Sequence, residues 1–178
     1  MRIIAGQFKG KKLKTFVGDA IRPTSDRARE SLFNIIAPRL LNCSFLDLCA
    51  GTGAVGIEAI SRNAKCVEFV DIDKESVKIA EFNLKSIGKN VKVNLCDAKR
   101  YLLTTTKKFD VIFYDPPYEN KDIEDVLSIV LKNKILNDGG VFIYEHKVDR
   151  PSKDVEGYLR FDSRKYGIAV FDFYKYEV

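Results

Sequence analysis

The stretch LDLCAGTGAVG, residues 46–56, decides the fold. It ends a short apolar run at 44–50 that is typical of a buried strand, and it opens a helix-forming stretch at 54–63. Glycines let the backbone turn sharply and approach a ligand closely. Their spacing at 51, 53 and 56 fits G-x-G-x-x-G, and Asp71 follows twenty residues after Gly51. An acid at that place is suited to the hydroxyls of a ribose, so the pattern predicts a nucleotide-type ligand, NAD included.

Strands and helices alternate after this turn. Strands are predicted at 65–73, 90–98, 109–118 and 139–146, helices at 74–88 and 123–133, and two pairing strands within 157–178. Such alternation implies right-handed crossovers and a parallel sheet with helices on both faces. The final hairpin must place one antiparallel strand in that sheet. The fold class is therefore α/β.

The N-terminal part is predicted to extend this core. Residues 1–20 read as a small hairpin whose Gly- and Lys-rich turn at 6–12 is flanked by apolar residues. A helix follows, capped by Thr24 or Ser25 without a capping box, and Pro38 should end or kink it. We expect one domain over 1–178, with a catalytic core at 21–178.

Positive charge is concentrated in the same part of the chain. Residues 1–40 hold nine Lys and Arg against three Asp and Glu, whereas 41–178 hold 21 against 22. A localised basic surface favours a phosphate-rich partner. A solvated basic face is the alternative, and charge alone does not separate the two.

Several classes of protein are disfavoured. No apolar run approaches the roughly 20 residues that cross a bilayer, and charges interrupt the first residues, unlike a signal peptide. We expect a cytoplasmic protein without a membrane partner. The four cysteines form no Cys-x-x-Cys pair and the chain has one His, so no metal site is expected. The thiols are expected to be reduced and mostly buried.

Four acids are predicted to meet at one edge of the sheet. Asp47, Asp71, Asp97 and Asp115 lie at or near the carboxyl ends of their strands, where open α/β sheets bind ligands. Asp47 would repel the pyrophosphate of NAD, whereas Asp97 can accept a hydrogen bond from an adenine amine. Four acids suit a ligand with a positive sulfonium and ammonium better than a dinucleotide anion. Each acid taken singly is equally well explained as a cap or turn residue.

The sequence Asp115-Pro116-Pro117-Tyr118 follows the apolar strand VIFY directly. It offers a carboxylate, the carbonyl of Pro116 and an aromatic face at Tyr118. An exocyclic amine on a flat base would donate its two hydrogens to the first two groups, while Tyr118 stacks on the base. In-line positioning of this weak nucleophile should then supply much of the rate. The competing interpretation is a Pro-Pro strand terminator without chemistry.

These motifs resemble class I AdoMet methyltransferases of the N6-adenine/N2-guanine type. More closely, the chain resembles the small-subunit ribosomal RNA guanine-N2 methyltransferase family (RsmD). The resemblance covers RIIAGQFKGKKL at 2–13, IRPTSDRARESLFNII at 21–36, LDLCAGTGAVGIEAISR at 46–62, FVDID at 69–73, DPPY at 115–118 and RKYG at 164–167. It implies a Rossmann-like seven-stranded sheet of order 3-2-1-4-5-7-6, AdoMet as cofactor, no metal, and a specific guanine N2 of 16S rRNA as target. The partner would be the small subunit or an assembly intermediate, and the protein a monomer.

The resemblance also implies residue roles. The catalytic residues would be Asp115, Pro116, Pro117 and Tyr118. The cofactor would contact Thr24, Asp47, Ala50, Gly51, Thr52, Gly53, Asp71, Ile72, Asp97 and Ala98. RNA phosphates would be held by Arg2, Lys9, Lys11, Lys12, Lys14, Arg22, Arg27 and Arg29. Alternatives left open are a tRNA guanine-N2 or DNA adenine-N6 methyltransferase, a dehydrogenase, and a non-catalytic RNA-binding module.

Overall fold

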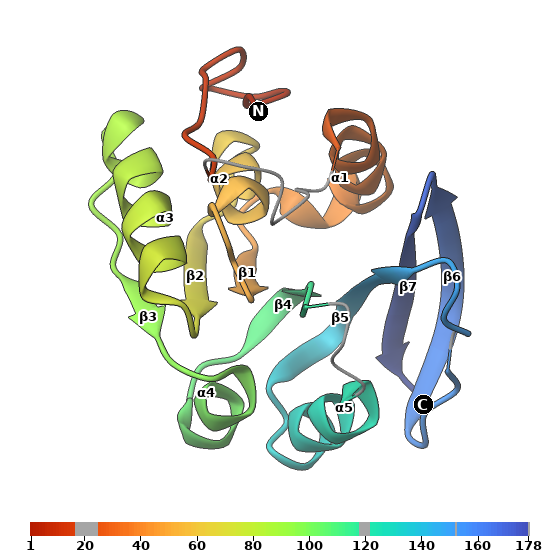
Figure 1. Ribbon diagram of the computed structural model, residues 1–178. Coiled ribbons are helices and arrows are strands. Elements are labelled where there is room, and N and C mark those ends of the chain that lie inside the picture. The colour runs from red at the N-terminus through yellow and green to blue at the C-terminus, as the bar shows by residue number, and fades with distance from the viewer. Residues whose placement is uncertain (17–24, 118–121, 152, 178) are drawn as a thin grey trace.

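The computed structural model describes residues 1–16, 25–117, 122–151 and 153–177. Seven strands form one sheet in the order β3-β2-β1-β4-β5-β7-β6, as expected for the predicted fold (Figure 1). The strands are β1 Ser44–Leu48, β2 Cys66–Asp71, β3 Val93–Leu95, β4 Phe109–Tyr114, β5 Leu136–Lys147, β6 Tyr158–Tyr166 and β7 Ala169–Tyr176. β7 pairs antiparallel with both β5 and β6, and the other pairs are parallel. The prediction of one antiparallel strand is confirmed.

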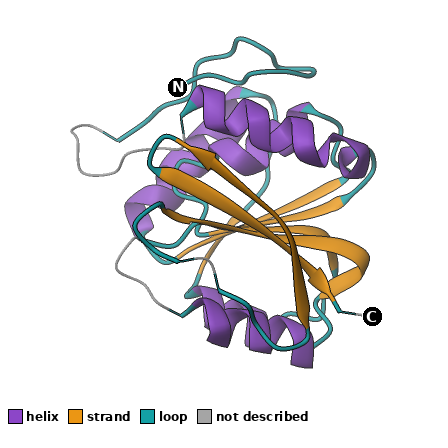
Figure 2. Ribbon diagram, turned by 90° about the vertical axis from the view of Figure 1, so that its right-hand side faces the viewer, coloured by secondary structure: helices purple, strands orange, loops and turns teal. Residues whose placement is uncertain are grey.

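Helices cover both faces of the sheet (Figure 2). They are α1 Asp26–Leu40, α2 Ala54–Ser61, α3 Lys74–Ser86, α4 Ala98–Thr104 and α5 Ile123–Lys132. Apolar residues of α1, α2 and α3 pack with one face, and those of α4 and α5 pack with the other. Strand β4 shows why, because Val111 and Phe113 join the first core while Ile112 and Tyr114 join the second. A sheet buried on both sides explains its near-continuous apolar strands.

Helix α1, helix α4 and strand β3 differ from the sequence prediction. Ser25 is the N-cap of α1, its Oγ accepting from the amide of Ala28 at 3.2 Å, but Pro38 does not end the helix. The helix continues to Leu40, which is buried and anchors the last turn, while Pro38 lies on the exposed face. Helix α4 was not predicted, and β3 is shorter than the run at 90–98.

The N-terminal segment, residues 1–16, is a docked loop with a single antiparallel bridge between Arg2 and Lys12. The amide of Ile3 donates to the carbonyl of Lys11 at 2.9 Å. Ile3 and Leu13 are buried in the core shared by α1, α2 and α3. The antiparallel course of the predicted hairpin is therefore present between Arg2 and Lys12. The apolar side chains of the segment pack against helices rather than within a pair of strands.

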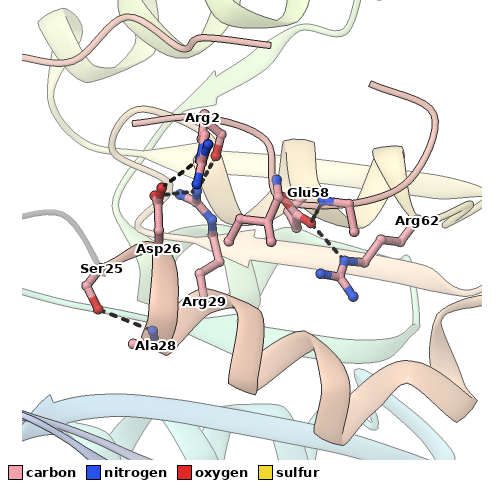
Figure 3. A network of polar contacts seen from close by, with 9 residues as sticks. Arg2, Ser25, Asp26, Ala28, Arg29, Glu58 and Arg62 are labelled. Atoms are coloured by element: carbon pink, nitrogen blue, oxygen red, sulfur yellow. Dashed lines mark hydrogen bonds and ion pairs between the residues drawn. The ribbon is translucent and has the colours of Figure 1, made fainter. Parts of the chain in front are cut away.

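A buried carboxylate on α2 attaches this segment (Figure 3). Glu58 is fully buried and accepts from the amides of Ile4 and Ala5 at 2.8 and 3.0 Å. It also pairs with Arg62 one turn later, with 2.8 Å between Oε1 and Nε. Two backbone donors that a loop would otherwise leave unsatisfied are thus bonded by one side chain.

Arg29, predicted to bind RNA, is instead fully buried beside this network (Figure 3). Its Nη2 donates to the carbonyl of Arg2 and to Asp26 Oδ1, the latter at 3.1 Å. Burial lowers the pKa of the guanidinium, while the charges of Glu58 and Asp26 oppose this. The prediction was wrong because the helical period of α1 turns position 29 inward with Leu32 and Phe33.

We expect Glu58→Ala to lower the free energy of unfolding by about 3 to 5 kcal/mol. The substitution removes a buried negative charge that interacts favourably with Arg29, and it leaves the amides of Ile4 and Ala5 without an acceptor. Urea denaturation measures the change. Glu30→Ala, on the exposed side of α1, is the control and should stay within about 0.5 kcal/mol of the wild type. Equal stability of the two variants would contradict the structural role assigned to Glu58.

Candidate functional site

The turn after β1 has the backbone that its glycines predict. Gly51 and Gly53 have φ of +55° and +77°, and Cys49 between strand and turn has +71°. A Cβ at Gly51 would meet nothing within 4 Å, so the turn leaves open space at this point. A Cβ at Gly56 would lie 2.3 Å from the ring of Phe69 on β2. The glycines therefore serve two needs, an open bend and a close approach of helix to sheet.

Asp47 on β1 stabilises this bend through a hydrogen bond to the start of α2. Its side chain is buried, and Oδ2 accepts from the amide of Gly56 at 2.8 Å in the first turn of α2. The N-cap of α2 is Gly53, which has no side chain, so Asp47 supplies from the strand the acceptor that a local cap would provide. Burial raises the pKa of Asp47 to about 8, although the Gly56 hydrogen bond lowers it and Asp71 raises it further.

Asp71 closes the bend from the neighbouring strand. Its Oδ2 accepts from the amide of Gly51 at 2.7 Å, and its Oδ1 accepts from Asp73 at 2.8 Å. Burial raises the pKa of Asp71, against the effect of these hydrogen bonds. Each oxygen bonds one amide and retains acceptor capacity for a ligand hydroxyl. The predicted juxtaposition of glycine bend and acid is therefore present.

The remaining predicted cofactor residues surround the same edge. Ile72 is 68% exposed, which is unusual for an isoleucine directly after a buried strand. The amide of Cys96 donates to the carbonyl of Asp71 at 2.9 Å and brings the end of β3 alongside. Asp97 is exposed and caps α4 through the amide of Arg100 at 3.0 Å, with half-buried Ala98 next to it. A contact of Asp97 with adenine stays a prediction.

Asp115 lies beside the bend. Its amide donates to the carbonyl of Leu48 at 3.4 Å, so the end of β4 meets the residue that precedes the turn. Asp115 and Pro116 are partly and fully buried, and Pro117 is exposed. Burial raises the pKa of Asp115 strongly, and the charges of Glu145 and Asp47 raise it further. The backbone of Asp115 therefore lies beside the glycine bend, and its carboxyl group lies near those of Asp47 and Glu145.

Glu145 was not predicted as part of this site. It is 3% exposed on β5, and the pairing of Tyr114 with Tyr144 places it opposite Asp115. Its signal was the alternation of β5, which puts residue 145 on the face of Val141 and Ile143. A row of carboxylates thus runs across three strand ends.

His146 is a core residue with a partner within hydrogen-bond distance of each ring nitrogen. It is buried, with Nε2 at 3.0 Å from Asp172 and Nδ1 at 2.9 Å from the carbonyl of Lys147. Tyr166 packs on Phe171 with ring centroids 5.7 Å apart, in line with a packing role.

The predicted RNA residues separate into three groups. Those on the described surface are exposed: Arg2, Lys9, Lys11, Lys12, Lys14 and Arg27. Arg29 is buried, as shown above. Arg22 lies outside the described residues, as do Thr24, which was predicted to contact the cofactor, and Tyr118, which was predicted to be catalytic, so these three roles stay predictions.

One further residue links the two regions. Asn83 on α3 is buried, and its Nδ2 donates to the carbonyl of Thr52 in the glycine bend at 2.9 Å. The same side chain bonds the amide of Lys14 at 2.7 Å and its carbonyl at 3.0 Å. The N-terminal segment and the bend therefore share one anchor, which no short sequence pattern announces.

Three smaller findings concern the burial of the cysteines, metal binding and membrane-spanning helices. Cys43 is buried, Cys49 and Cys96 are partly buried, and Cys66 is exposed, so the expectation of mostly buried thiols was wrong. Within the described ranges, no three His, Cys, Asp or Glu side chains are grouped to hold a metal ion, and no helix is long and apolar enough to cross a membrane.

Known proteins resemble the chain over nearly its whole length. The family model described as "Conserved hypothetical protein 95" matches residues 1–175. "Putative rRNA methyltransferase YlbH" of Bacillus subtilis is 35% identical over 98% of both chains. "Ribosomal RNA small subunit methyltransferase D" of Haemophilus influenzae is 31% identical, over 98% of this chain and 93% of its own. The solved structure of "Putative methyltransferase yhhF from Escherichia coli" has a TM-score of 0.88 at 30% identity, covering 99% of this chain and 98% of that one.

A family match over residues 1–175, together with curated relatives that are 31% and 35% identical over 98% of this chain, leaves one assignment. The chain belongs to the family described as conserved hypothetical protein 95, the RsmD family of ribosomal RNA small subunit methyltransferases.

Proposed function

We propose that this protein transfers a methyl group from AdoMet to the exocyclic N2 amine of a specific guanine in 16S rRNA. The observation that carries the proposal is the position of Asp115, whose backbone bonds Leu48 at the mouth of the glycine bend. The names of the relatives support the coarser statement, a methyltransferase of small-subunit rRNA.

The residues at the sheet edge suit AdoMet. Gly51 leaves open space for a ligand to approach the backbone, and Asp71 retains acceptor capacity beside it for ribose hydroxyls. Exposed Ile72 offers an apolar surface for an adenine ring, and Asp97 an acceptor for its amine. Asp47 and Asp115 favour a cationic ligand near the bend, because a positive charge lowers the raised pKa of each.

AdoMet supplies an electrophilic methyl group on a positively charged sulfur. Asp115 accepts one hydrogen of the guanine amine and the carbonyl of Pro116 accepts the other, which aims the nitrogen lone pair at that methyl. Tyr118 stacks on the base. When bound, AdoMet would give up this methyl group to the nitrogen and be released as a neutral thioether. Positioning in this sense accounts for much of the acceleration that delocalised amines require.

The methylated nitrogen must then lose one proton. Asp115 is suited to accept it, directly or through water, because burial and its acidic neighbours raise its pKa and make it a stronger base than an exposed aspartate. The positive charge that the methyl donor brings would pass to the methylated nitrogen, so the loss of this proton restores a neutral amine.

We further propose that the substrate is the guanine as presented by the small subunit or an assembly intermediate, bound by one protein molecule in the cytoplasm. In this proposal the folded RNA and its proteins supply most of the specificity. The target base must be unstacked to reach Asp115, at a cost of a few kcal/mol. Exposed lysines of the N-terminal segment would hold phosphates at this point.

Asp115→Asn should reduce methylation of unmodified small subunits at least about 100-fold while AdoMet affinity falls much less, because positioning of the amine is lost, one negative charge near the cation is removed and the bend is intact. Transfer of tritium from labelled AdoMet, with mapping of the modified nucleotide, measures the first quantity, and calorimetry the second. Asp149→Asn, an exposed acid after β5, is the matched control. Full activity of Asp115→Asn, or label on a nucleotide other than guanine, would overturn the mechanism.

The protein without ligand should lose stability as the pH rises from about 5 to 8. The pKa of Asp47 is about 8 when folded, against about 3.9 when unfolded, so the folded state binds the proton more tightly in this window. Each pH unit then costs up to about 1.4 kcal/mol per such group. Urea unfolding at several pH values should show a smaller decline in Asp47→Asn, which keeps an acceptor for Gly56. Identical declines in variant and wild type would exclude Asp47 as the titrating group.

A further inference from the structure

Helix α3 carries a basic stripe that the sequence analysis did not include. Lys74, Lys78, Phe82 and Lys85 are all exposed, and their spacing of three and four residues places them on one face. Phe82 is 56% exposed although apolar residues of this helix, such as Ile79 and Leu84, are buried. An aromatic ring thus stands in solvent between lysines, and neither core packing nor capping explains it.

The stripe adjoins the N-terminal segment through contacts of Lys14 and Lys11. Lys14 Nζ lies 5.3 Å from the centroid of the Phe82 ring. Lys11 Nζ donates to the carbonyl of Ser86 at the end of the helix. Asn83, one residue after Phe82, fixes the backbone of Lys14 through two hydrogen bonds. The two elements therefore form one surface whose geometry is set by a buried side chain.

The charge of this surface is strongly positive. Residues 1–16 contain five Lys and Arg and no acid. On α3, Glu75 and Glu81 flank the stripe without interrupting it, and Glu81 is partly buried. A surface of this sign with one exposed ring matches a partner that offers both phosphates and flat bases.

We propose that the α3 stripe and the N-terminal segment together bind a single-stranded part of the RNA, with lysines on its phosphates and Phe82 stacked on an unpaired base. This deepens the proposed function, on which it rests, by assigning an RNA contact on the outer face of α3. Lys14 would contact the phosphate next to the stacked base, because its Nζ lies 5.3 Å from the centroid of the Phe82 ring.

Other partners fit the surface less well. Protein interfaces are depleted in lysine at their centres. An interfacial helix on an anionic membrane presents a broad row of large apolar residues, whereas this face has Phe82 alone among lysines. RNA accounts for both the charge and the single ring.

The charge part is tested with Lys78→Gln/Lys85→Gln and a fluorescein-labelled 20-nucleotide oligouridylate. The matched control is Lys108→Gln/Lys132→Gln, which removes two exposed lysines that precede β4 and end α5. We expect fluorescence anisotropy to show weaker binding, and the slope of log affinity against log salt to fall in magnitude by about 1.4, about 0.7 for each lost phosphate contact. The control should keep the wild-type slope.

The ring is tested with Phe82→Leu, which keeps an apolar side chain, and Phe82→Tyr, which keeps an aromatic face. Loss of stacking should weaken oligouridylate binding about fivefold or more in Phe82→Leu, with an unchanged salt slope. Phe82→Tyr should bind as the wild type does. Because Phe82 is exposed, both variants should fold, and urea denaturation checks this.

The outcomes separate this proposal from the function on which it rests. Wild-type affinity and slope for oligouridylate in the stripe variants would overturn it, whatever their methylation activity. Loss of affinity for small subunits with unchanged oligouridylate binding would show a protein partner instead, and would also overturn it. A wild-type protein that binds oligouridylate through the stripe but does not methylate small subunits would refute the proposed function and leave the RNA surface standing.

Discussion

A buried carboxylate at the end of the central strand constrains the rest of the site. The carboxyl group of Asp47 is buried at the end of β1, where it accepts a hydrogen bond from the amide of Gly56. A buried carboxyl group without such a partner would cost several kcal/mol, so helix α2 must begin where one of its amides can donate to Asp47. That requirement fixes the glycine bend between strand and helix. Asp71 then bonds the amide of Gly51 and closes the bend from β2.

Helix α2 extends this constraint to the N-terminal segment. All eight residues of α2 are buried, because the sheet covers one side and the segment contributes to the cover on the other. Glu58 bonds two amides of the segment, and Asn83 on the neighbouring helix bonds its last described part. A loop outside the α/β core is thus held by buried acceptors rather than by strand pairing. Its lysines are exposed to solvent while its backbone is fixed.

Opposite charges are separated on the molecule. Carboxylates line the edge where β1, β4 and β5 end, and the raised pKa values of Asp47 and Asp115 follow mainly from burial and in part from neighbouring acids. Lysines cover the N-terminal segment and the outer face of α3. The acidic edge of the sheet suits a small cation, and the basic surface of α3 and the N-terminal segment suits a polyanion. The net charge of +5 is therefore the sum of an acidic region and a basic region. The side chain of Asn83 connects the glycine bend with the basic surface, because it bonds both Thr52 and Lys14.

The sequence by itself determined the alternation of strands and helices, the glycine bend and the meeting of Asp47, Asp71 and Asp115 at one edge. These depend on local periods and on short connections, which place the ends of parallel strands together. Only the tertiary structure decided that Arg29 is buried, that α1 passes Pro38, and that Phe82 stands in solvent beside Lys14. Each of these outcomes depends on which distant residue packs against a position. Spacing along the chain carries no record of that, because burial is settled by contacts between segments far apart in sequence.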